Sequence, residues 1–299
     1  MAVVDWVKKR PLWVYFVLAC AITWALMVPA MIIATQKGYA LPSPVTFGGL
    51  IESGFANGQH VALSLMLALA HGPLIGAIVV AAAEGSLREW WQRVTRWRAG
   101  AQGYRDLALL LVALYVPVVL IGLATGIFPA AEARVVPLIY LAPFFLYEVL
   151  TSGMEEPGWR GYALPKLLTR FNAKKASLIL GLVWGLWHWP VFIENYIIAA
   201  NDPTTPLVAD VIGTAVQCLG YIGLSILPMA FIHTWLYNRT QSAFLSLLLH
   251  ATANVLSSYT LATQPMVGTI GGVMRWVVAI VLLRFFWTEA ARPSQGIQR

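Results

Sequence analysis

The chain has 299 residues, of which 59% are hydrophobic and only 11% are charged, and its mean hydropathy is +0.70. This composition excludes an ordinary soluble domain and is typical of a polytopic membrane protein. We attribute the net charge of +7 to membrane topology and anionic headgroups and expect no nucleic-acid partner. Cys20 and Cys218 match no C-x-x-C spacing, which argues against a disulfide framework or a thiolate-bound metal.

Apolar stretches long enough to cross a bilayer recur along the whole chain. A crossing helix needs about 20 apolar residues. The pattern predicts eight spans, at about residues 11–34, 61–83, 107–128, 136–153, 176–193, 208–236, 241–259 and 266–287. The predicted fold is therefore all-α, with residues 1–299 forming a single membrane domain and both termini on the same side of the membrane.

The basic residues fix the expected orientation of these spans. Lys and Arg collect in cytoplasmic loops. One side of the predicted bundle carries 17 of the 20 Lys and Arg, the other carries only Lys37 and Arg134, and Arg275 lies inside the last span. The sequence thus predicts cytoplasmic termini and an integral protein of a bacterial plasma membrane.

The stretch "REWWQRVTRWRAGAQGYRD" from Arg88 interrupts the apolar pattern after the second predicted span. It places Trp90, Trp91 and Trp97 among several arginines. Such a mixture is typical of an amphipathic helix at the membrane interface. We expect it to lie on the cytoplasmic face and to act as a topological anchor.

Ionisable side chains inside membrane spans are costly to bury, so each is a functional candidate. The sequence places nine of them in or beside spans: His71, Glu148, Glu155, Glu156, Arg160, His188, His233, His250 and Arg275. Four of them have simple structural interpretations. A Glu148–Arg275 ion pair would neutralise both charges, and His71 could bond a carbonyl freed by the proline two residues later. His233 either supports the site residues from behind or is interfacial, and we favour the interfacial interpretation.

The stretch "SGMEEPGWRGYALP" from Ser152 carries three of these charges. Glu156 and Arg160 are four residues apart in the order that favours an ion pair on a helix. Such a pair lowers the cost of burying both groups. Glu155 lies on a neighbouring face without that partner, and we expect it to be free to act as a general base.

Two further segments place polar groups four residues apart. Trp184 and His188 share one helical face, and so do His250 and Asn254. Counting a rise of about 1.5 Å per residue from the basic loops puts both segments at a depth similar to that of Glu155. The sequence therefore predicts that three distant segments meet within the membrane.

These groups would suffice to hydrolyse an amide bond. Glu155 could take a proton from water that His188 holds, while His250 and Asn254 donate hydrogen bonds to the developing oxyanion. A polar network that merely joins helices explains the same spacing. On spacing alone the two interpretations are equally well supported.

Three short motifs appear in order within a predicted catalytic core at about residues 136–259. The matching positions are Glu155, Glu156 and Arg160 for E-E-x-x-x-R, Trp184 and His188 for F-x-x-x-H with Trp in place of Phe, and His250 and Asn254 for H-x-x-x-N. In these motifs the chain resembles the CAAX prenyl protease and bacteriocin-processing family, also called CPBP or Abi. A lone E-E-x-x-x-R would be weak, but all three motifs in a multi-span protein are a specific signal.

The resemblance implies an eight-helix intramembrane endopeptidase that cleaves near the C-terminus of a substrate or within a leader. It implies that Glu155 and His188 activate water and that His250 and Asn254 form the oxyanion site. Glu156 and Arg160 would have a supporting role. The expected partners are the lipid bilayer and a peptide or protein substrate, with or without a lipid anchor.

Metal dependence is disputed for this family, whose members are often labelled metalloproteases. The chain lacks H-E-x-x-H, and a zinc ion could be held at best by Glu155, His188 and His250. Asn254 would then have no ligand role, so we expect a metal-free site without a cofactor.

Two rival functions remain. The first is a non-catalytic family member acting in bacteriocin immunity or as a membrane scaffold. The second is a transporter, which the absence of repeated halves disfavours.

Overall fold

The computed structural model describes residues 2–42, 50, 53–127, 138–193, 206–260 and 265–287. These residues form helices joined by short turns, and none of them lies in a β-strand. The predicted all-α polytopic fold is confirmed. Cys20 and Cys218 are both free thiols, as the sequence predicts.

The first half of the chain forms a helical hairpin layer followed by one long helix. A glycine in the left-handed region ends α2, α5 and α7, at Gly38, Gly85 and Gly126. Glycine reaches this conformation without steric cost and is the common helix stop. The helices are α1 Ala2–Lys9, α2 Pro11–Lys37, α4 Gly58–Ala68, α5 Gly72–Glu84, α6 Leu87–Val94 and α7 Gly100–Thr125.

The second half carries the three motifs on shorter and less regular pieces. The first motif lies on a run of 3₁₀, α and π turns rather than on one regular helix. This run comprises η1 Leu138–Tyr140, α8 Leu141–Leu150, η2 Ser152–Glu155, α9 Glu156–Gly158, η3 Trp159–Ala163 and α10 Leu164–Leu168. The remaining elements are α11 Ala173–Trp187, α12 Trp189–Ile193, α13 Leu207–Tyr221, the π-helix η5 Ile222–Ile226, α14 Leu227–Thr240, α15 Ala243–Thr260, α16 Pro265–Val281 and the π-helix η6 Leu282–Phe286.

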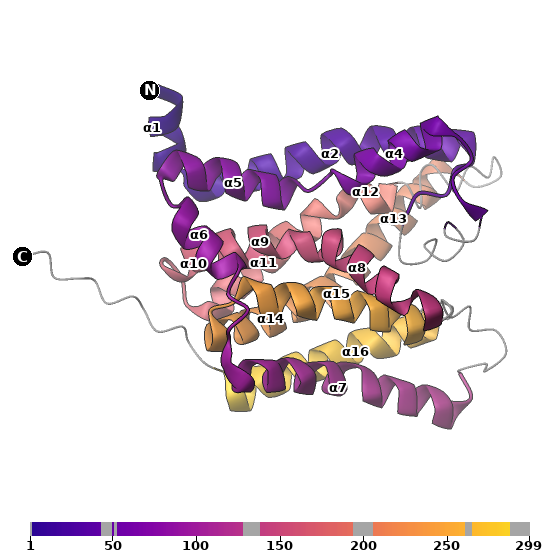
Figure 1. Cartoon of the computed structure of the whole chain (residues 1–299). Coiled ribbons are helices and arrows are strands. Elements are labelled where there is room, and N and C mark those ends of the chain that lie inside the picture. The colour runs from indigo at the N-terminus through magenta and orange to yellow at the C-terminus, as the bar shows by residue number, and fades with distance from the viewer. Residues whose placement is uncertain are drawn as a thin grey trace, which may run out of the picture.

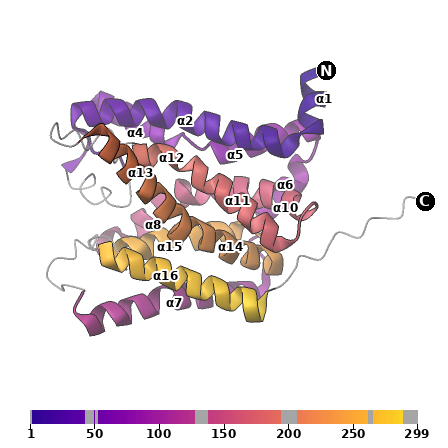
Figure 2. The ribbon, with the colours of Figure 1, turned by 180° about the vertical axis from the view of Figure 1, so that it is seen from behind.

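The helices stack in layers, with the motif-bearing elements in the middle. Figure 1 shows α2, α4 and α5 along one side of the bundle and α7 with α16 along the opposite side. The view from behind shows α11, α13, α14 and α16 crossing that side of the molecule (Figure 2). Helix α15 packs against α7, α8, α9, η2 and α14, so the third motif lies at the centre of the bundle.

The helices differ in their capacity to cross a membrane. Among the described residues, four segments are long and apolar enough by length and composition: Pro11–Lys37, Gly100–Thr125, Val211–Thr240 and Met266–Phe286. A fifth is the bent pair α4 and α5. The other predicted spans coincide with shorter helices, α8 with 10 residues, α11 with 15 and α15 with 18. The chain is an integral membrane protein, and the count of eight spans stays a prediction.

The predicted span 61–83 is broken in its middle. Helices α4 and α5 are bent by 50° at residues 69–71, just before Pro73. The Thr23 hydroxyl of α2 donates to the Ala70 carbonyl at 2.9 Å and accepts from the Gly72 amide at 3.1 Å. It also accepts from Trp187 Nε1 at 2.9 Å. The bend predicted near His71 is therefore present, but Thr23 bonds the freed carbonyl.

The arginine-rich stretch forms α6, a short turn and the start of α7, and its role is more than the predicted anchor. Trp91 and Trp97 are exposed, as expected at an interface. Trp90 is 4% exposed and donates from Nε1 to the Pro157 carbonyl at 2.9 Å. Arg93 donates from Nε to the Gly161 carbonyl at 2.8 Å. Helix α6 thus holds the irregular segment that carries the first motif.

Candidate active site

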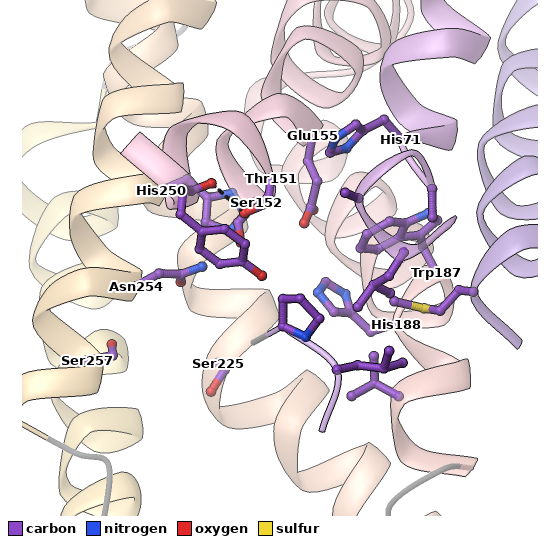
Figure 3. A pocket seen from close by; sticks show the side chains of 18 of the residues that line it. His71, Thr151, Ser152, Glu155, Trp187, His188, Ser225, His250, Asn254 and Ser257 are labelled. Atoms are coloured by element: carbon purple, nitrogen blue, oxygen red, sulfur yellow. Dashed lines mark hydrogen bonds between the residues drawn. The ribbon is translucent and has the colours of Figure 1, made fainter. Parts of the chain in front are cut away.

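The four predicted catalytic residues line one cavity of about 920 Å³. Figure 3 shows the side chains of Glu155, His188, His250 and Asn254 turned toward this common space. They come from η2, the end of α11 and α15, which are distant in the sequence. The predicted meeting of three segments is confirmed. Their catalytic roles stay a prediction at this point.

Glu155 is held by two indole groups, which corrects the expectation that it lacks a partner. Trp184 Nε1 donates to Glu155 Oε2 at 2.7 Å, and Trp159 Nε1 donates to the same oxygen at 3.3 Å. Glu155 is only 7% exposed. Hydrogen bonds to an ionised carboxylate are stronger than neutral ones and fix its orientation. Both bonds use Oε2, so Oε1 is left to accept from a further donor.

Trp184 contributes more than the aromatic wall that the sequence suggests. Its ring lies under the Arg160 guanidinium, with Cζ 4.4 Å from the ring centroid, while its N–H reaches Glu155. Phe, the residue of the family motif, could provide the ring contact but has no N–H to donate. The Trp at this position therefore adds a hydrogen bond to the carboxylate.

His188 has a defined tautomer in this structure. Its Nδ1 lies 2.8 Å from the Trp184 carbonyl oxygen, which can only accept. Nδ1 therefore carries the proton, and Nε2 of the neutral ring is an acceptor. The ring is wedged between Trp187 and Tyr221, with centroids 4.8 and 5.6 Å away. A fixed acceptor nitrogen thus lines the cavity that also contains Glu155.

The predicted Glu156–Arg160 ion pair is confirmed, and it also holds His250. Arg160 Nη1 donates to Glu156 Oε1 at 2.8 Å, and neither side chain is exposed. His250 Nδ1 lies 3.0 Å from the same oxygen. Because a carboxylate accepts, His250 donates from Nδ1 and its Nε2 is the nitrogen left for the cavity. The supporting pair therefore sets the orientation of His250.

His233 is buried, so its interpretation as an interfacial residue is wrong. Its side chain is fully buried on α14, and Nδ1 lies 3.8 Å from Glu156 Oε2. The His233 ring also contacts those of Trp184 and His250, with both centroid distances at 6.0 Å. His233 thus lines the cavity on the side of Glu156.

Asn254 is oriented by a second buried carboxylate. Asn254 Nδ2 donates to Glu148 Oε2 at 2.9 Å, and Ser152 Oγ donates to the same oxygen at 2.8 Å. Arg275 instead donates to Ser225 Oγ at 3.1 Å. The predicted Glu148–Arg275 pair is therefore wrong, because Glu148 faces the third motif.

The zinc set that the sequence offers is Glu155, His188 and His250. Among the residues that the structure describes, no three His, Cys, Asp or Glu side chains come together in a way that could hold a metal ion. The expectation of a metal-free site stays a prediction. Glu155 Oε1 and the Nε2 atoms of His188 and His250 are not used in the hydrogen bonds described above.

The motif analysis missed several hydrogen bonds that orient the site residues. The Trp159 and Trp184 indole donors and the acceptor role of Glu148 are the main ones. Glu148 and His233 carry the signal that could have found them, since both are ionisable residues in apolar segments. The indole bonds leave no such signal, because Trp is common in membrane helices and its partner is set by packing.

The fold and the cavity define an integral membrane protein with a polar site enclosed among its helices. Residues 137–256, which include all three motifs, match the family described as type II CAAX prenyl endopeptidase Rce1-like. The chain is also 33% identical over 150 residues to CAAX prenyl protease 2 of Methanococcus maripaludis. That match covers 50% of this chain and 49% of the archaeal protein, so it spans about half the length of the curated relative. The segment that carries the three motifs is therefore the part of the chain that is similar to these CAAX endopeptidases.

Proposed function

We propose that the chain is an intramembrane endopeptidase that hydrolyses a peptide bond with water activated by Glu155. The observation that carries the proposal is the shared cavity of Glu155, His188, His250 and Asn254, in which each side chain is oriented by a neighbour. The relationship to CAAX endopeptidases supports the same reaction class. Orientation matters because catalysis depends on groups placed before the reaction begins.

Glu155 and His188 have complementary roles toward a water molecule. His188 Nε2 accepts one proton of the water in a hydrogen bond, which fixes the water in place. Glu155 Oε1 takes the other proton as the water oxygen attacks the carbonyl carbon of the substrate. The same proton passes to the leaving amine nitrogen when the C–N bond breaks. No covalent intermediate with the protein is needed.

His250 and Asn254 stabilise the oxyanion that this attack creates. Asn254 can donate with the second hydrogen of Nδ2, since the first is bonded to Glu148. His250 can donate from Nε2 only as an imidazolium, because its other proton is bonded to Glu156. The nearby Glu156 carboxylate favours that cation. Together they provide two donors for the developing negative charge.

The proposal requires no metal ion and no other cofactor. Its support is the separate hydrogen-bond role of each of Glu155, His188 and His250. An opening of the cavity toward the cytoplasm is not supported, because its lining includes Tyr39, Ala40 and Leu41, which follow Lys37 on the side opposite the basic loops. We further propose that the protein lies in a bacterial plasma membrane with both termini in the cytoplasm. The basic loops support this orientation. The substrate would be a membrane-associated peptide or protein, with or without a lipid anchor.

Comparing cleavage in membranes that contain active or inactive protein tests this function. Glu155→Gln and His188→Ala should each remove cleavage, by about 100-fold or more, because general-base catalysis is worth that much. Terminal proteomics of membranes with wild type or Glu155→Gln would reveal the substrate as a missing cleaved terminus. A reporter built on that sequence then gives rates for the purified variants.

Glu89→Gln is the matched control, since Glu89 is exposed on α6 away from the cavity. It should cleave at the wild-type rate. Retained cleavage in both Glu155→Gln and His188→Ala would overturn the mechanism. The same cleaved termini in membranes with wild type and with Glu155→Gln would favour a scaffold or immunity protein instead.

A further inference from the structure

Residues 85–99, which we call the α6 segment, join two parts of the chain that are long and apolar enough to cross a membrane. The bent pair α4 and α5 ends at Glu84, and α7 begins at Gly100. Figure 1 shows α6 between them at one end of the bundle. A short connection between two spanning segments lies at the membrane surface. The α6 segment is therefore placed beside lipid headgroups.

The exposed side of the α6 segment is basic and aromatic. Trp91 is 58% exposed and Trp97 is 55% exposed, and the Arg98 guanidinium lies over the Trp97 ring at 4.7 Å. Exposed indoles among arginines match the boundary between acyl chains and headgroups. The segment contains one acidic residue, Glu89, and four arginines, which are Arg88, Arg93, Arg96 and Arg98.

Two of these arginines come together over one part of α14. The charges of Arg93 and Arg96 both act on the Tyr237 hydroxyl. Arg93 is half-buried and uses its Nε on the Gly161 carbonyl at 2.8 Å, whereas Arg96 is exposed. The Arg96 carbonyl accepts from Ser242 Oγ at 2.7 Å, which fixes the backbone at this turn. Two guanidinium groups therefore meet at a defined place.

Neither arginine has an acidic partner in the described part of the chain. At this end of the bundle Glu84 pairs with Lys166, and no salt bridge joins a described acidic residue to Arg93 or Arg96. The only hydrogen bond from the Arg93 side chain to a described residue is the one from Nε, so Nη1 and Nη2 can still donate. Two neighbouring cations repel each other unless an anion lies between them. The pair is therefore incomplete without an anion.

The anion that fits this place is the phosphate of a phospholipid. Guanidinium groups match the geometry of phosphate oxygens and donate two hydrogen bonds at once. Phosphates lie in the headgroup layer, which is where the exposed indoles put the α6 segment. An anionic lipid fits better than a zwitterionic one, because no ammonium group offsets its phosphate beside the unpaired arginines.

The α6 segment is also joined to the backbone of the first motif, residues 155–163. The hydrogen bonds from Trp90 and Arg93 described above end on carbonyls on either side of Arg160. A Cβ placed on Gly161 would lie 3.0 Å from Val94 Cγ2, so α6 packs closely on this backbone. Anything that fixes Arg93 therefore also fixes the backbone around the buried ion pair.

We propose that Arg93 and Arg96 bind the phosphate of an anionic phospholipid, and that the bound lipid stabilises the segment that carries the first motif. The terminal nitrogens of Arg93 contact the phosphate while its Nε holds the Gly161 carbonyl. Without such a lipid the two arginines repel each other and the hold on this segment loosens. The proposal goes beyond the proposed function, because it concerns a lipid partner at the surface and requires no cleavage.

Native mass spectrometry of the purified full-length protein measures this binding. Phosphatidylglycerol and phosphatidylcholine with the same acyl chains are titrated separately into the protein in detergent. The Kd values for the first bound lipid are then compared. One arginine near an anionic lipid contributes about fivefold in affinity. The two arginines should make phosphatidylglycerol bind about 25-fold more tightly than phosphatidylcholine.

Arg96→Gln should lower this preference about fivefold. Its side chain bonds no described residue, so the fold should be unaffected. Arg96→Lys should keep most of the preference because the charge remains. The double variant Arg93→Gln with Arg96→Gln should lower the preference to about one. Arg284→Gln is the control, since it removes the same charge from an exposed position on η6, after α16, and it should keep the full preference.

Three results would overturn the site. They are equal binding of the two lipids to the wild type, a full preference in the double variant, and the same loss in Arg284→Gln as in Arg96→Gln. The last result would indicate a diffuse attraction of the whole basic face in place of a site at these two arginines.

Amide hydrogen exchange tests the link to the first motif. With phosphatidylglycerol at about 100 times its Kd, exchange in residues 156–168 should slow by up to about 100-fold, the limit set by that ratio. The double variant should show no such slowing. A wild type that prefers phosphatidylglycerol but exchanges at an unchanged rate would overturn the link. Neither measurement involves cleavage, so Glu155→Gln should bind the lipid like the wild type, and failure of the lipid site would leave the proposed peptidase function intact.

Discussion

Glu156 both neutralises Arg160 and orients His250, so replacing it should lower both stability and activity, and the two losses can be separated with a second substitution. Glu156→Gln keeps the shape of the side chain and removes its charge. Both groups of the ion pair are fully buried, with a nitrogen–oxygen distance of 2.8 Å. Removing one partner leaves Arg160 as an unpaired buried cation, which costs about 3–5 kcal/mol. At roughly 2–4 °C per kcal/mol, the Tm should fall by about 10 °C.

The double variant Glu156→Gln with Arg160→Gln should recover most of this loss. It removes both charges, and replacing a buried pair by neutral groups is often nearly neutral. Arg160 also leaves Nε and Nη2 without a hydrogen-bond partner, so the wild-type pair is incompletely satisfied. Activity should not recover, because His250 still lacks its carboxylate.

Thermal unfolding in detergent, followed by intrinsic fluorescence, measures the stability of the three proteins, and a reporter peptide measures cleavage. The expected pattern is a low Tm for the single variant, a near wild-type Tm for the double variant, and little activity in either. A single variant as stable as wild type, or a double variant less stable than the single, would refute the reasoning about the buried pair.

Trp184→Phe keeps the ring under Arg160 but removes the N–H donor to Glu155. It should lower kcat/KM for the reporter by about 10- to 100-fold with little change in Tm. Wild-type activity would show that the indole hydrogen bond is dispensable. Gly158→Ala should lower the Tm clearly, because the added methyl group would overlap the Pro73 carbonyl, whereas Gly213→Ala has free space and should not. Equal Tm values would contradict that packing. Incubation with 1,10-phenanthroline should leave cleavage unchanged, and a loss that zinc restores would overturn the metal-free mechanism.

Spacing within one helix predicts the local part of the site correctly. Glu156 and Arg160 pair because four residues bring them to one helical face. The same rule places His250 and Asn254 on the same side of α15. The motif resemblance then gives the order in which these segments contribute to the site. These features depend on the spacing of residues along one helix, which can be read directly from the sequence.

The contacts that orient the site depend on packing between distant segments. Glu148 and Asn254 are 106 positions apart, and Trp184 and Glu155 are 29 apart. Periodicity says which residues share a face but not which face of another helix they meet. The break near His71 shows a second limit, because hydropathy is continuous through residues 61–83 while Gly72 and Pro73 interrupt the helix.

The Thr23 hydroxyl limits which residues can replace threonine at this position of α2. A hydroxyl has one proton and two lone pairs, and Thr23 uses all three, on Ala70, Gly72 and Trp187. Valine would match its shape and orphan three buried groups at once. Serine is the one other residue that offers the same donor and acceptors at the same distance from the backbone. Position 23, in an otherwise apolar helix, is therefore restricted to Thr and Ser by hydrogen bonds that take no part in bond cleavage.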